Sequence, residues 1–111
     1  MSENQISKNN PTLNLDELYE LITIKSKSSN INSYSKKLIE QPVNLVAQKI
    51  GEEGVEVAIS ALDHDRHQNQ NTKNEIIKEV ADLFYHTTAL LVKYDIKFSD
   101  IFHEFYLRNK K

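Results

Sequence analysis

Apolar residues recur three and four positions apart along most of this chain, the spacing of one face of an α-helix. No segment keeps the alternation of apolar and polar residues that marks a half-buried β-strand. The spacing predicts helices over residues 15–25, 34–40, 43–62, 72–94 and 98–109. We therefore expect an all-α fold, a small bundle of four to five helices that forms one domain over residues 15–109.

The remaining segments are polar and have the composition of loops. Residues 1–14 are rich in Asn and Ser, which predicts a flexible N-terminal arm. Asn14 is a suitable N-cap for the first helix, because Glu17 stands three residues later and completes a capping box. Residues 26–33 and 63–71 are predicted loops between helices.

Both long helices carry a narrow acidic stripe between apolar sides, whereas an ordinary surface helix has one apolar and one broad polar face. In the 72–94 helix this stripe centres on Asp82. In the 43–62 helix the polar residues form a seam, which consists of Lys49, Glu52, Glu53, Glu56 and Ser60. Apolar faces lie on both sides of that seam, so this helix needs two partners. We expect the second partner to be another copy of the chain, in a homodimer or a larger homo-oligomer.

The carboxylates of the two stripes are paired at helical contact spacing. Glu53 and Glu56 are three residues apart, and so are Glu79 and Asp82. Like charges at this spacing repel each other, and partial burial increases the penalty unless a cation bridges them. Mg²⁺ prefers carboxylate oxygens and keeps water and phosphate oxygens as its other ligands, so the pattern indicates a magnesium site for a polyphosphate. The alternative is a solvated acidic helix face that binds nothing.

Composition excludes several classes of function. The chain has 111 residues and a formal net charge of −2, without the basic excess of a nucleic-acid-binding protein. It has no cysteine, which excludes disulfides, thiolate zinc sites and cysteine nucleophiles. No apolar run has the length of a signal peptide core or a membrane span. These features predict a cytoplasmic protein that acts on a small molecule.

Two sequence blocks resemble the phosphoribosyl-ATP pyrophosphatases of histidine biosynthesis, a branch of the all-α, MazG-like nucleoside triphosphate pyrophosphohydrolases. The first block is AQKIGEEGVE over residues 47–56, and the second is EVADLFYH over residues 79–86. The segment SYSKKL over residues 33–38 is also similar to the family, and the resemblance extends over residues 15–108.

The resemblance implies that the chain hydrolyses phosphoribosyl-ATP to phosphoribosyl-AMP and pyrophosphate with Mg²⁺, as a dimer or a larger assembly. Transferred by position, the metal ligands are Glu53, Glu56, Glu79 and Asp82, and the catalytic carboxylates are Glu52, Glu53 and Glu79, with Glu52 a candidate to position the water. Lys49 is a candidate phosphate contact and His86 a candidate contact to the substrate or to a metal ligand. The pattern does not choose which carboxylate is the general base.

Residue spacing alone leaves other roles open for two of these side chains. Lys49 has the spacing of a salt bridge to the acidic residues one turn later, and His86 that of a surface partner for Asp82. A rival function with the same metal motif is a house-cleaning pyrophosphatase that acts on dCTP, dUTP or damaged triphosphates. A third interpretation is a catalytically silent helical bundle that serves as an interaction module.

Overall fold

The computed structural model describes residues 10–110, and within that range it contains five α-helices and no β-strand. The helices are α2 (Leu15–Ser26), α3 (Tyr34–Glu40), α4 (Asn44–His67), α5 (Gln70–Lys93) and α6 (Phe98–Asn109). This confirms the predicted all-α fold. Residues 1–9 of the predicted N-terminal arm lie outside the described residues.

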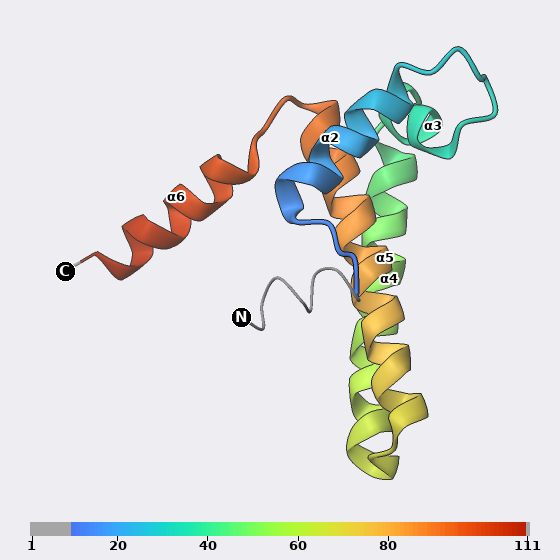
Figure 1. Ribbon diagram of the computed structural model, residues 1–111, viewed down its shortest axis with the longest axis vertical. Helices are drawn as coiled ribbons and strands as arrows, with labels where there is room; N and C mark the ends of the chain where they lie inside the picture. Colours follow the sequence, from blue (N-terminus) through green and yellow to red (C-terminus); the bar gives the residue numbers. More distant parts are fainter. Residues whose placement is uncertain (1–9, 111) are drawn as a thin grey trace.

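A long antiparallel hairpin of α4 and α5 forms the axis of the molecule (Figure 1). The predicted loop over residues 63–71 is wrong, because α4 continues to His67 and α5 begins at Gln70. The reversal needs only two residues. Gln68 adopts the left-handed conformation, with φ 46° and ψ 57°, and its N–H donates to the carbonyl of His64 at 2.7 Å. Asn69 then caps α5 through the backbone N–H of Thr72. Local hydrogen bonding thus replaces the glycine that commonly ends a helix.

The short helices α2 and α3 pack across one end of this hairpin (Figure 1). The predicted cap of α2 is present, since the side chain of Asn14 accepts from the N–H of Glu17 at 2.8 Å and the Glu17 carboxylate accepts from the N–H of Asn14. The core where these elements meet is small. Its fully buried members are Ile22, Leu38, Val46 and Ala89.

Lys93, the last residue of α5, holds the end of α3 in place. Its ammonium group donates to the carbonyl oxygens of Ile39 at 2.6 Å and Gln41 at 2.7 Å, two of the carbonyls that the end of α3 leaves without helical partners. The contact joins residues more than fifty positions apart, so it fixes α3 against the hairpin.

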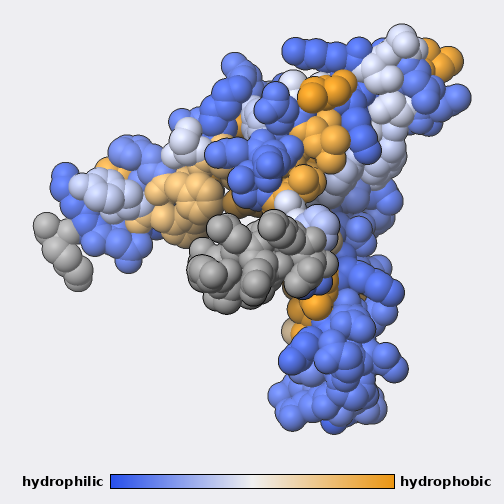
Figure 2. Space-filling view, in the orientation of Figure 1, coloured by the Kyte–Doolittle hydropathy of each residue, from blue (hydrophilic) through white to orange (hydrophobic). Residues whose placement is uncertain are grey.

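Large apolar side chains remain exposed on the hairpin and on α6. Figure 1 shows α6 projecting away from the hairpin, and Figure 2 shows apolar surface on α6 and at its junction with the rest of the molecule. The exposed residues of α6 include Phe102, Phe105 and Tyr106. None of the helices between residues 10 and 110 is both long and apolar enough to cross a membrane.

Replacement of Lys93 with Met should lower the free energy of unfolding by about 1–2 kcal/mol, because it removes two charge-assisted hydrogen bonds at a partly exposed site. Urea unfolding followed by circular dichroism measures this change. Lys73→Met is the matched control on the same helix, since the Lys73 ammonium contacts no hydrogen-bond or ion-pair partner among the described residues. Equal stability of the two variants would show that Lys93 does not hold α3.

Candidate metal centre

The contact between α4 and α5 follows a helical repeat that includes two of the predicted site residues. The buried or half-buried positions of α4 include 46, 50, 53, 57, 60 and 64, and those of α5 include 72, 76, 79, 83 and 86. Alternating steps of four and three are the seam pattern of two packed helices. At one end of the seam His64 Nδ1 lies 2.7 Å from the hydroxyl oxygen of Thr72, which fixes the register. Glu53 and Glu79 therefore occupy positions that packed helices usually fill with apolar side chains.

This register brings three carboxylates together from two helices. One oxygen each of Glu53, Glu79 and Asp82 lies within 4.8 Å of the others. Glu53 and Glu79 are half-buried and Asp82 is exposed, so the cluster opens to solvent on one side. Within the described part of the chain, no lysine, arginine or histidine forms a salt bridge with any of the three.

Glu79 is the member of the cluster whose pKa is raised. Burial raises the pKa of its carboxyl above the ordinary value of 4.5, and the neighbouring charges of Glu56, Asp82, Glu53 and Glu75 raise it further, in that order. A hard divalent cation among these oxygens would relieve this repulsion, and three carboxylates are a donor set that such a cation accepts. The residues present therefore fit a magnesium-type site.

Glu56 and Glu52 lie outside the group of three. Glu56 is exposed, yet its charge is the largest electrostatic influence on Glu79, so it lies at the margin of the cluster. Glu52 is also exposed and accepts a hydrogen bond from the amide of Gln48 at 3.0 Å, while the ammonium of Lys49 lies 3.6 Å from its other oxygen. The hydrogen bond from Gln48 is the main reason that the pKa of Glu52 is lowered. Lys49 thus forms a salt bridge with Glu52, the alternative role that its spacing in the sequence left open.

His86 is buried, with 6% of its surface exposed, and both of its ring nitrogens are engaged inside the chain. Nδ1 lies 2.8 Å from the backbone carbonyl oxygen of Asp82, and Nε2 lies 2.6 Å from the hydroxyl of Tyr34. Sequence reasoning assigned no role to Tyr34. It comes from α3, 52 residues before His86, and no local spacing connects the two.

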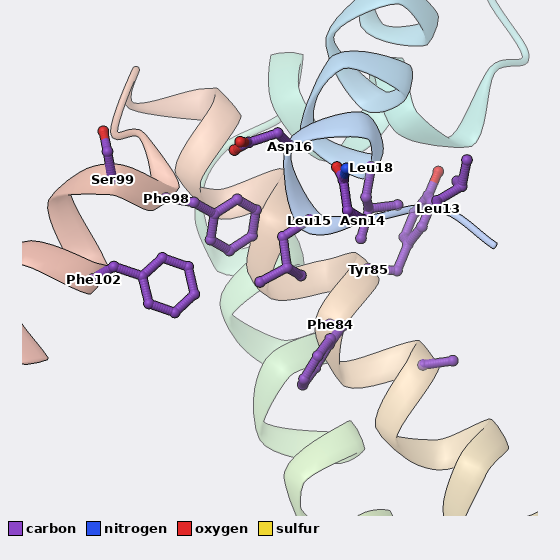
Figure 3. Close-up of a pocket in the computed structure, with 11 residues that line it drawn as sticks. Leu13, Asn14, Leu15, Asp16, Leu18, Phe84, Tyr85, Phe98, Ser99 and Phe102 are labelled. Atoms are coloured by element: carbon purple, nitrogen blue, oxygen red, sulfur yellow. The ribbon is translucent and has the colours of Figure 1, made fainter. Parts of the chain in front are cut away.

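A large cavity along the described residues lies elsewhere. It has a volume of about 1070 Å³ and lies between α2, α5 and α6. Figure 3 shows its apolar lining, which includes Leu15, Phe84, Phe98 and Phe102. No member of the carboxylate cluster lines it, and a polyphosphate would find no cationic partner there. The residues that fit a cation are therefore those of the carboxylate cluster and not those of this cavity.

The fold and the cluster together define a small all-α protein with an acidic centre built across a helical hairpin. The sequence profile of the family described as phosphoribosyl-ATP pyrophosphohydrolase matches residues 15–109. The chain therefore belongs to the phosphoribosyl-ATP pyrophosphohydrolase family. This confirms the family predicted from the two motif blocks and the predicted class of enzyme, a hydrolase.

Named relatives agree with this assignment. The chain is 35% identical to the phosphoribosyl-ATP pyrophosphatase of Clostridium novyi over 97 residues, which cover 87% of this chain and 82% of that protein. It is 38% identical over 106 residues to the histidine biosynthesis bifunctional protein HisIE of Campylobacter jejuni, and 38% identical over 97 residues to that of Pasteurella multocida. These matches cover 96% and 87% of this chain, but only 48% and 45% of the bifunctional proteins.

Glu79→Gln should make the metal-free protein more stable at neutral pH. A carboxyl with a raised pKa binds more protons in the folded than in the unfolded state, so its contribution to stability falls as pH rises from the ordinary value of 4.5 through the raised one. The neutral amide of the variant has no such loss. Urea unfolding in EDTA at a series of pH values should therefore show an advantage of the variant that grows with pH.

The matched control is Glu20→Gln, an exposed carboxylate on α2 away from the cluster. The pH profile of this variant is the reference against which the profile of Glu79→Gln is compared. Parallel pH profiles for Glu79→Gln and the wild type would contradict the electrostatic account of Glu79.

Proposed function

We propose that this chain hydrolyses phosphoribosyl-ATP to phosphoribosyl-AMP and pyrophosphate with Mg²⁺, the second step of histidine biosynthesis. The observation that carries the proposal is the convergence of Glu53, Glu79 and Asp82 within 4.8 Å in a chain that belongs to the phosphoribosyl-ATP pyrophosphohydrolase family. The reaction joins the oxygen of a water molecule to one phosphorus of the triphosphate and breaks one phosphoric anhydride bond, with pyrophosphate as the leaving group.

In this proposal Glu53, Glu79 and Asp82 hold the cation, and Glu56 is retained as a fourth candidate ligand because its charge acts on Glu79. The bound cation supplies charge neutralisation for the triphosphate and lowers the pKa of a coordinated water. Half-burial of Glu53 and Glu79 supports this role, because partial exclusion of water strengthens every charge interaction at the site.

Half-buried Lys49 and exposed Glu52 are the candidates to meet the substrate. The ammonium of Lys49 is held by Glu52 at 3.6 Å on a solvent-accessible surface, where such a pair exchanges readily. We propose that Lys49 binds a phosphate oxygen when substrate is present, and that Glu52 then accepts a hydrogen bond from the attacking water. In this proposal residues 15–109 form the catalytic domain, and residues 1–14 are an arm outside it. The absence of cysteine supports action in the reducing cytoplasm.

Pyrophosphate release from phosphoribosyl-ATP should require Mg²⁺ and stop in EDTA, and it should exceed release from dCTP, dUTP and ATP measured in parallel. Glu53→Gln should reduce turnover at least about 100-fold, because one of three converging charges is lost from the cation site. The exposed Glu20→Gln variant should retain wild-type activity. Release from the free triphosphates instead would favour a house-cleaning enzyme, and no release from any nucleotide would leave the helical bundle without catalytic function.

We further propose that two copies of the chain associate through apolar helix faces. Val55, Ile59 and Leu62 form an exposed stripe on α4, at positions i, i+4 and i+7. Only five hydrophobic residues are buried in the described chain, which is a small core for a domain of this size. A continuous exposed stripe beside so small a core supports self-association, because a second copy would bury the apolar area that the single chain leaves in water.

Ile59→Lys should convert the assembly into monomers, because it places a charge in the middle of the stripe, where the side chain of Ile59 is 57% exposed in the single chain. Analytical ultracentrifugation over a range of concentrations measures the shift in mass. Ile31→Lys is the matched control, since Ile31 is 77% exposed in the loop before α3, away from the stripe. A mass of one chain for the wild type at every concentration would contradict the proposed association.

A further inference from the structure

Two consecutive hydrogen bonds connect helix α3 to the turn of α5 that carries Asp82. The hydroxyl of Tyr34 lies 2.6 Å from His86 Nε2, and Nδ1 of the same ring lies 2.8 Å from the backbone carbonyl oxygen of Asp82. The ring between them is buried. The spacing of residues in the sequence does not predict this connection, and the proposed reaction does not use it.

The direction of the two bonds follows from the chemistry of their atoms. A backbone carbonyl can only accept, so Nδ1 carries the proton and donates it to the oxygen of Asp82. In the neutral imidazole Nε2 is then an acceptor, and the hydroxyl of Tyr34 is the donor. Because both nitrogens are used in this way, His86 has no free donor or acceptor for a substrate group. Its influence on the site passes through its neighbours.

Aromatic packing holds the Tyr34 hydroxyl in position beside His86. The ring of Tyr34 stacks on that of Tyr85, with centroids 6.3 Å apart, and meets the ring of His86 edge-on at 5.6 Å. Burial is the main cause that raises the pKa of the Tyr34 phenol. The charge of Lys49 lowers it, and the weaker influences of Tyr85, Glu53 and Asp82 raise it. The phenol thus lies within electrostatic reach of two of the three clustered carboxylates.

We propose that Tyr34 is a positioning residue of the cation site, which acts through His86 to hold the Asp82 turn of α5 in register with α4. The inference rests on the proposed function for the identity of the site as a cation centre. Without the hydroxyl, Nε2 of His86 is a buried acceptor with no partner, and the ring can leave the carbonyl of Asp82 to find one. The convergence of Asp82 on Glu53 and Glu79 then loosens.

Tyr85 provides a matched control for this role. Its hydroxyl is hydrogen-bonded to the hydroxyl of Ser35, so it also joins α5 to α3. The ring of Tyr85 meets that of His86 edge-on at 5.6 Å, but its hydroxyl forms no hydrogen bond with either ring nitrogen. Tyr34→Phe and Tyr85→Phe each delete one hydroxyl from neighbouring, stacked rings at the same helix contact. Both variants should lose similar stability, and only the first should affect the cation.

The experiment is a titration of the full chain with Mn²⁺, followed by electron paramagnetic resonance of the free ion, for the wild type and both variants. Tyr34→Phe should raise the Kd for Mn²⁺ about 10-fold, the scale on which outer partners of metal ligands act, and Tyr85→Phe should leave it unchanged. In the pyrophosphate assay Tyr34→Phe should need about 10-fold more Mg²⁺ for half-maximal activity and should recover wild-type kcat at saturating Mg²⁺.

The outcomes separate this role from the proposed reaction. Weaker Mn²⁺ binding by Tyr34→Phe alone, without pyrophosphate release by any form, supports the positioning role and contradicts the reaction. Normal Mn²⁺ binding by Tyr34→Phe in an active enzyme overturns the positioning role and leaves the reaction intact. Equal weakening in both tyrosine variants also overturns it, because the hydroxyls would then serve only helix packing, and so does a wild type that binds no Mn²⁺.

Discussion

The packing of α4 against α5 forces like charges close together, and this constraint governs the rest of the structure. Glu53, Glu79 and Asp82 lie within 4.8 Å of one another, without a salt bridge from any described side chain. Their repulsion opposes the hairpin contact. Burial is the main cause that raises the pKa of Glu79, and the charges of Asp82 and Glu53 raise it further. The other contacts of the hairpin offset this repulsion. In the proposed function, a bound divalent cation would make the same arrangement favourable.

The remaining elements can be understood as supports for that hairpin. Lys93 fastens α3 to the end of α5, Tyr34 and His86 connect α3 to the turn of Asp82, and His64 fixes the far end through Thr72. The seam between α4 and α5 is partly polar, so apolar side chains such as Ile59 remain on the outside. The polar side chains of α4 lie in the seam with α5, so its apolar side chains face outward. The exposed apolar face supports self-association.

Helical periodicity and capping residues predicted most of the fold, because both signals are local. The turn at Gln68 was missed, since a left-handed residue without glycine has no clear sequence signal and polar residues tolerate a helix as well as a loop. Spacing treated Glu53 and Glu56 alike, although the packing of α4 turns the first inward and leaves the second exposed. Tyr34 could not be found, because 52 residues separate it from His86 and only tertiary packing joins them.

The most direct test of the account is anomalous diffraction from crystals of the full chain grown with Mn²⁺, which locates the ion without reference to activity. The account predicts a peak between the carboxylates of Glu53, Glu79 and Asp82, with Glu56 as the fourth candidate ligand. A peak at another acidic group, such as the Asp63–Asp65 end of the hairpin, with none at the cluster, would contradict it.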